Sequence, residues 1–154
     1  MALTISVEIK RSFKVDCPAD DVFNVLSDVP YSASHFPKVD QLIDMGDNTF
    51  RWEMEKLGID KYSIQTIYAA RYSSNRDQGR VQWEPVKGIG NGSVAGEWNI
   101  LPENGMTCCD FLTHGELSLP LPKLVKFIVS PFVIHEFEGM VDTYIKNLRQ
   151  TLES

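Results

Sequence analysis

Residues 132–153 read FVIHEFEGMVDTYIKNLRQTLE, and this stretch decides the fold. Its apolar residues recur at helical steps of three and four, and the facing positions are mostly charged. A helix of this length spans about 33 Å at 1.5 Å per residue, roughly the width of a small domain. We therefore predict one long amphipathic helix at the end of the chain, with Ser130 as its cap and Pro131 in its first turn. The apolar stripe consists of Val133, Phe137, Met140, Val141, Tyr144, Leu148 and Leu152.

The rest of the chain predicts strands, with two short helices near the start. Residues 3–15 alternate between apolar and polar side chains, as a half-buried strand does. Pro18 suits the first turn of a short helix, and a second short helix is predicted over 31–36. Because the later strands are joined by short turns, we expect an antiparallel meander packed on the long helix, an α+β architecture. The predicted strands are 39–45, 49–57, 61–72, 80–86, 94–101 and 106–119.

Composition and charge narrow the function classes. The chain has 154 residues, which fits one domain over 1–154. Its net charge of −6 argues against binding to nucleic acid, which needs a cationic surface. Three cysteines cannot all pair within the chain, which favours reduced thiols and a cytoplasmic location. No Cys or His pair has metal-ligand spacing, so we expect no metal site. We also expect no cofactor.

Near the start, residues 18–28 read PADDVFNVLSD and are followed by Phe36-Pro37 and the strand series. This order resembles the START-like (SRPBCC) superfamily, which includes polyketide cyclases and dehydrases and lipid-transport proteins. The resemblance covers essentially the whole chain. It implies a helix-grip fold, in which a bent antiparallel sheet of about seven strands surrounds a long C-terminal helix and two short helices close one end. It also implies a pocket, but no catalytic motif of the superfamily carries over onto this sequence.

The candidate ligand-binding residues are mostly aromatic and share the strand parity that should face the helix. Sites for apolar ligands are concave and lined by such side chains, with a few polar anchors. Thr66, Thr113 and Tyr144 are the candidate anchors, with hydrogen bonds to the backbone as the competing interpretation. The competing interpretation is that the rings simply fill the core. The three tryptophans favour a cavity, because each brings a polar N–H that needs a partner. The candidates are Phe36, Trp52, Met54, Tyr62, Ile64, Thr66, Tyr68, Trp83, Trp98, Phe111, Thr113, Phe137, Val141 and Tyr144.

Catalysis has one weak candidate residue. General acid–base chemistry needs a group with a pKa near neutrality, and histidine is the usual choice. His35 lies beside Phe36-Pro37, where the short helices should cap the cavity. His114 shares a parity with acidic residues, and His135 projects off the apolar stripe. No set of nucleophile, base and orienting acid is recognisable.

The most apolar segment, residues 117–134, reads LSLPLPKLVKFIVSPFVI. Its length suits a membrane span, but three prolines and two lysines make a spanning helix improbable. We interpret it as a buried connector. The alternative is a lid, or a rim that makes transient contact with a membrane.

The sequence thus predicts binding or transport of a hydrophobic small molecule, such as a lipid, polyketide, isoprenoid or quinone. The first alternative is an enzyme of the polyketide cyclase/dehydratase type that uses the same cavity. The second is a protein-interaction module, such as a chaperone cofactor or assembly factor, which would have an exposed apolar patch and no enclosed volume. The oligomeric state is left open.

Overall fold

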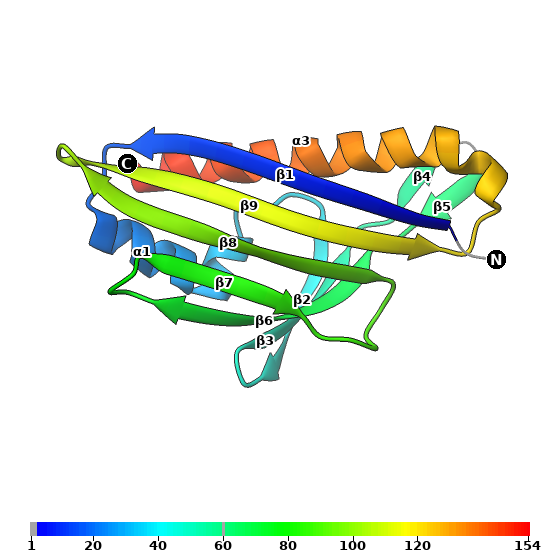
Figure 1. Ribbon diagram of the computed structural model, residues 1–154, viewed down its shortest axis with the longest axis horizontal. Helices are drawn as coiled ribbons and strands as arrows, with labels where there is room; N and C mark the ends of the chain where they lie inside the picture. Colours follow the sequence, from blue (N-terminus) through cyan, green and yellow to red (C-terminus); the bar gives the residue numbers. More distant parts are fainter. Residues whose placement is uncertain (1–2, 60) are drawn as a thin grey trace.

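A long helix packs against a curved antiparallel sheet in the computed structural model, which describes residues 3–59 and 61–154 (Figure 1). The single domain predicted over 1–154 includes residues 1, 2 and 60, which lie outside this range. The described sheet has seven strands in the order β1-β9-β8-β7-β6-β3-β2. The helix-grip architecture predicted from the sequence is confirmed. The strands are β1 (Leu3–Val15), β2 (Val39–Gly46), β3 (Thr49–Met54), β6 (Ile67–Asn75), β7 (Arg80–Pro85), β8 (Gly92–Glu103) and β9 (Met106–Leu119).

The two longest strands, β1 and β9, pair along their whole length, from Leu3 opposite Leu119 to Val15 opposite Thr107. On one parity of β1, the side chains of Leu3, Ile5, Ile9 and Val15 are almost fully buried. These apolar side chains form one inner face because neighbours along a strand point to opposite sides of the sheet. The alternation in residues 3–15 therefore marks the face that packs toward the helix.

Two short helices follow β1: α1 (Ala19–Ser27) and α2 (Val29–Ala33). The second helix begins earlier than the predicted 31–36. Its cap is Asp28, whose carboxylate accepts a hydrogen bond from the amide of Tyr31 at 3.2 Å. Pro30 falls within the first turn, where its missing N–H costs nothing. Pro30 therefore lies at the start of the second helix.

The strands predicted over 49–57 and 61–72 are each interrupted, and that prediction is wrong in detail. The chain leaves the main sheet after Met54 and forms a separate hairpin, β4 (Leu57–Ile59) and β5 (Tyr62–Ile64), before β6 begins at Ile67. The side chain of Asn91 stabilises this break by bonding the backbone of Gln65 and Ile67. Its side-chain amide donates to the Gln65 carbonyl at 2.8 Å and accepts from the Ile67 amide at 2.9 Å. Asn91 thus bonds the backbone where a strand neighbour is missing.

The long helix α3 (Lys126–Leu152) starts six residues before the predicted 132–153, after a 3₁₀ turn η1 (Lys123–Val125). The prediction of Ser130 as its cap is wrong, and Pro131 lies inside the helix. Proline removes one backbone hydrogen bond there. The helix continues through it because Val129 and Val133, on either side, are buried against the sheet and the β4–β5 hairpin. In Figure 1 this orange end of α3 lies beside β4 and β5.

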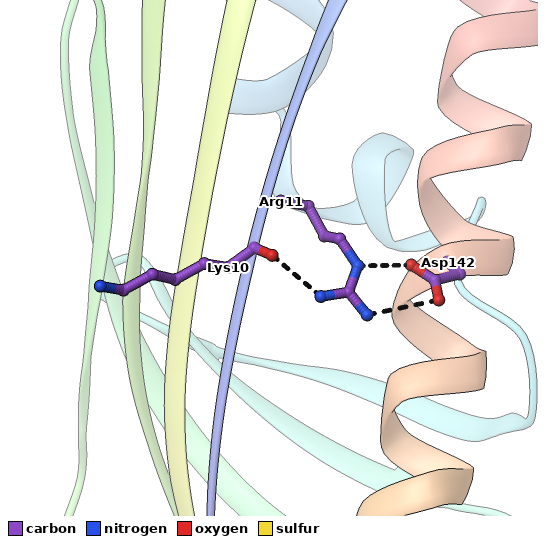
Figure 2. Close-up of polar contacts among 3 residues, drawn as sticks. All are labelled: Lys10, Arg11 and Asp142. Carbon is purple, nitrogen blue, oxygen red and sulfur yellow. Dashed lines mark hydrogen bonds and ion pairs between the residues drawn. The ribbon is translucent and has the colours of Figure 1, made fainter.

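An ion pair joins α3 to the edge strand β1 (Figure 2). The Nε of Arg11 donates to Oδ1 of Asp142 at 2.7 Å, and another guanidinium nitrogen donates to the Lys10 carbonyl at 2.9 Å. The hydrogen bond to Asp142 raises the pKa of Arg11. The contact links the middle of α3 to the edge of the sheet.

The segment 117–134 is only partly the buried connector that we predicted. Leu119 and Val129 are buried, whereas the side chains of Leu124 and Phe127 are 84% and 76% exposed. The exposed residues lie on the outer side of η1 and of the first turn of α3. No helix of the described residues is both long and apolar enough to cross a membrane.

Candidate ligand-binding cavity

A cavity of about 110 Å³ lies between the inner face of the sheet, α2 and α3. One buried water needs only about 10–15 Å³, so this cavity is several times larger than a void that holds a single water. Its walls come from strands of the main sheet and from α1, α2 and α3. The curvature of the sheet therefore leaves an internal volume beside the helix.

Most of the residues predicted from strand parity line this cavity, and two do not. Ile64 is buried instead with Val129 and Val133 in the cluster that closes one end of the fold. Tyr62 is half-buried, with the Lys61 ammonium 5.7 Å from its ring centre. Both lie on the β4–β5 hairpin, because the predicted strand breaks before β6. The predicted residues that line the cavity are Phe36, Trp52, Met54, Thr66, Tyr68, Trp83, Trp98, Phe111, Thr113, Phe137, Val141 and Tyr144.

Aromatic rings form a continuous wall of the cavity. Trp52 and Tyr68 are cross-strand neighbours on β3 and β6, and their rings stack at 5.8 Å with planes 9° apart. Phe36, which follows α2, meets the Trp52 ring edge-on at 5.7 Å. Offset stacking and edge contacts are the arrangements that aromatic pairs prefer. These ring contacts fix the orientation of the side chains that line the cavity.

Trp83 extends this wall because its cross-strand neighbour is Gly96. A Cβ at Gly96 would lie 2.6 Å from the Trp83 ring and 2.4 Å from the Leu112 carbonyl oxygen. Only glycine therefore lets the indole lie across β8. There its ring centre is 5.9 Å from that of Phe111.

Three tyrosines bring phenol hydroxyl groups to the mostly apolar lining. The Tyr72 hydroxyl accepts a hydrogen bond from Nε1 of Trp52 at 3.0 Å, and the Tyr144 hydroxyl shares one with Oγ of Ser32 at 2.6 Å. Among the described residues, the hydroxyl of Tyr68 has no hydrogen-bond partner, and no buried side-chain nitrogen or oxygen is left unpaired. The Tyr68 hydroxyl is therefore free to bond a molecule in the cavity, which this residue lines.

Burial raises the pKa of Tyr68, Tyr72 and Tyr144, because an ionised phenol loses its hydration in the apolar interior. Hydrogen bonds from Trp52 and Ser32 offset part of this effect on Tyr72 and Tyr144. All three phenols consequently stay protonated near neutral pH. Each can donate a hydrogen bond to an acceptor atom.

The lining carries little formal charge. Among the residues that the structure describes, it contains no lysine, arginine or histidine. Glu116 is its one carboxylate, and this residue is exposed at the part of the lining formed by β8 and β9. The predicted polar anchor Thr113 donates its hydroxyl to the Ala95 carbonyl at 3.3 Å, so it bonds the backbone.

His35 lies outside the cavity lining. It is buried between α2 and α3, where Nε2 lies 2.8 Å from Oγ1 of Thr151 and Nδ1 lies 3.0 Å from the Tyr31 carbonyl oxygen. These contacts tie the chain after α2 to the end of α3. His35 follows α2, and the direction of its side chain depends on a helix more than a hundred residues away.

Several lining residues were not among the sequence candidates. Tyr72 could have been found, since it shares the parity of Tyr68 within the predicted strand 61–72. Ile5, Val7 and Ile9 carry the same kind of alternation on β1. Ser32 gave no signal, because its role depends on meeting Tyr144 of α3.

Comparison with known proteins agrees with this architecture. A family model described as "Polyketide cyclase / dehydrase and lipid transport" matches residues 6–153, so the chain belongs to this family, within the START-like superfamily. No curated protein sequence matches the chain. Solved structures share the fold at low sequence identity.

Three of these structures illustrate the likeness. A protein of Thermus thermophilus is 16% identical with a TM-score of 0.70, over 94% of this chain and 96% of its own. The Zhui aromatase/cyclase of a Streptomyces species is 17% identical with a TM-score of 0.62, over 96% and 91%. A START superfamily protein of Mycobacterium smegmatis is 15% identical with a TM-score of 0.65, over 94% and 96%. At such identities the likeness concerns the fold.

Proposed function

We propose that the protein binds a neutral, largely apolar small molecule that carries a hydrogen-bond acceptor, and holds it between the sheet and α3. The observation that carries this proposal is an aromatic-walled cavity with phenol donors and, among the described residues, no cation in its lining. A lipid, polyketide, isoprenoid or quinone with a carbonyl group has the required chemistry. The cavity also argues against a protein-interaction module, because such a module is expected to have no enclosed volume.

Affinity and selectivity come from different parts of the lining. Removing apolar ligand surface from water contributes roughly 25 cal/mol per Å². A carbonyl oxygen that leaves water must regain a hydrogen bond, and the free Tyr68 hydroxyl can supply it. A carboxylate would lose its hydration without meeting a cation, which is far more costly. The lining therefore favours a neutral ketone or quinone over a fatty acid.

Two fluorescent probes of opposite character test this selectivity. Nile red is a neutral polycyclic carbonyl compound, and cis-parinaric acid is a fatty acid with a carboxylate. Titration at neutral pH is expected to show saturable binding that is tighter for Nile red. A variant that fills the cavity, Val141→Phe, should abolish binding, whereas Ile43→Phe on the exposed strand β2 should not. Equal or tighter binding of cis-parinaric acid contradicts the proposed charge selectivity.

Tyr68→Phe tests the proposed polar anchor. The variant removes only the hydroxyl and keeps the ring stacked on Trp52. We expect Nile red to bind about two- to tenfold more weakly, the effect of one hydrogen bond. Tyr62→Phe is the matched control, because Tyr62 lies outside the cavity lining. Unchanged Nile red affinity in Tyr68→Phe, together with unchanged stability, excludes this anchor.

A second candidate function is that of a polyketide cyclase or dehydratase, because the family description includes these enzymes. The Tyr144–Ser32 pair gives the cavity two hydroxyls joined by a hydrogen bond, with 2.6 Å between their oxygen atoms. Incubation with a poly-β-ketone thioester, followed by mass spectrometry, detects ring closure with loss of water. Tyr144→Phe should then slow the reaction. A rate equal to that without protein rejects this candidate.

We also propose that the protein is located in the cytoplasm. Cys17, Cys108 and Cys109 are free thiols, which suits a reducing compartment. Cell fractionation with a thiol-labelling reagent under denaturing conditions tests this placement. Recovery of oxidised protein from an extracytoplasmic fraction contradicts it.

A further inference from the structure

Three large apolar side chains lie exposed at the start of the long helix. Leu124 of η1 is 84% exposed, and Phe127 and Ile128 of α3 are 76% and 47% exposed. Residues three and four positions apart share one helical face, so the three side chains lie together. We refer to Leu124, Phe127 and Ile128 as the helix-start patch. Leu124 and Phe127 are the most exposed of the large apolar side chains that the structure describes.

The chain around the helix-start patch is basic although the protein is acidic. Residues 117–135 contain no aspartate or glutamate, and they carry Lys123 and Lys126. The whole chain has a net charge of −6. Both lysines are exposed, one on η1 and one at the first residue of α3. Positive charge thus flanks the apolar side chains, in the part of the chain where acidic residues are missing.

The helix-start patch covers the outside of the closed end of the fold. On the opposite side of the same helical turns, Val129 and Val133 are buried with Ile64 of the β4–β5 hairpin. Val133 also lines the cavity. In Figure 1 this is the orange end of α3, at the opposite end of the molecule from the β8–β9 turn. A surface that contacts the helix-start patch therefore lies one helix thickness from the cavity.

We propose that the helix-start patch docks the protein onto an anionic lipid bilayer. Leu124, Phe127 and Ile128 enter the boundary between head groups and acyl chains, and Lys123 and Lys126 lie at the level of the lipid phosphates. Apolar side chains flanked by lysines are the pattern of interfacial membrane binding. A protein partner fits less well, since a stable protein interface takes roughly 20–30 residues on each side. Docking does not depend on an occupied cavity, so this inference stands apart from the proposed function.

Vesicle co-sedimentation of the full chain tests the proposal. The vesicles are phosphatidylcholine alone, or phosphatidylcholine with phosphatidylglycerol in a three-to-one ratio. Wild-type protein is expected to bind the anionic vesicles, and to bind them less at high salt because screening weakens the lysine contribution. Leu124→Ser/Phe127→Ser should lower the partition coefficient about tenfold or more. Lys123→Gln/Lys126→Gln should lower it about fivefold per lysine, which corresponds to about 1 kcal/mol each.

Leu101→Ser is the matched control, because Leu101 is also an exposed leucine but lies near the β8–β9 turn at the opposite end. Its vesicle binding should equal that of the wild type. Phe127→Trp adds a reporter, whose emission is expected to shift to the blue when anionic vesicles are added.

Two results overturn the proposal. One is wild-type protein that does not bind anionic vesicles, or binds them as well after the Leu124→Ser/Phe127→Ser change. The other is sedimentation showing that this double variant loses self-association while vesicle binding is unchanged, which assigns the helix-start patch to a contact between two copies. Nile red binding by Leu124→Ser/Phe127→Ser separates the two hypotheses, since loss of docking with an intact cavity leaves it unchanged.

Discussion

At the scale of single residues, Gly96 is the clearest case of a side chain excluded by its surroundings. A Cβ there would overlap both the Trp83 ring and the Leu112 carbonyl oxygen. We predict that Gly96→Ala lowers the free energy of unfolding by about 1–3 kcal/mol, the usual effect of overpacking. Urea unfolding measures this loss. Nile red affinity should fall as well, because the displaced indole narrows the cavity.

Gly139→Ala should act in the opposite direction. Gly139 lies exposed within α3, and a Cβ there would meet no atom within 4 Å. Glycine in a helix interior costs roughly 0.5–1 kcal/mol relative to alanine, because the unfolded chain is more flexible. Urea unfolding of Gly139→Ala should therefore show a gain of that size. A loss of stability would mean that the surroundings of Gly139 are tighter than the structure indicates.

At the scale of elements, the Arg11–Asp142 pair joins α3 to β1 (Figure 2). Both side chains are partly exposed, so solvent screens their attraction. A double-mutant cycle with Arg11→Gln and Asp142→Asn should give a coupling energy of at most about 1 kcal/mol, and less at high salt. The Lys14–Glu103 pair, which does not involve α3, is a suitable comparison. A coupling of several kcal/mol would assign the pair a larger role in holding the helix.

The elements differ in how well their sequences predict them. Strand β1 and the second half of α3 have strong periodicity, because one face of each is buried along its length. The first turn of α3 lacks this signal, since Phe127 and Ile128 face solvent. The break between β5 and β6 is fixed by Asn91, which lies 24 residues beyond Ile67. No local pattern contains that contact.

At the scale of the whole molecule, buried phenols and a buried thiol make the fold sensitive to alkali. Burial raises the pKa of Cys109 from 9.0 to about 12, and it also raises the pKa of Tyr68, Tyr72 and Tyr144 above 10.0. Above pH 9 the unfolded chain therefore loses these protons before the folded protein does. The contribution of these groups to the free energy of unfolding is fully present below the pKa values of the unfolded chain, and it is lost as the pH rises beyond them.

The slope of this loss can be measured. Each such group lowers the free energy of unfolding by up to about 1.4 kcal/mol per pH unit within its window. The urea concentration at the unfolding midpoint should therefore be constant near neutral pH and fall steeply above about pH 9–10. Cys109→Ala should make the first part of the fall shallower. A midpoint that stays constant into the alkaline range contradicts the burial of these groups.

The sequence alone determined the architecture and most of the cavity wall, because periodicity records which face of each element is buried. The stripe of α3 and the alternation of the long strands are repeated at many positions, so single irregularities do not hide them. Only the tertiary structure decided that Tyr62 and Ile64 leave the cavity, that His35 turns toward Thr151, and that Ser32 meets Tyr144. These outcomes depend on contacts between residues far apart in the chain. The cavity also depends on such contacts, because its volume results from how the sheet and the helix pack together. No single segment of the sequence encodes it.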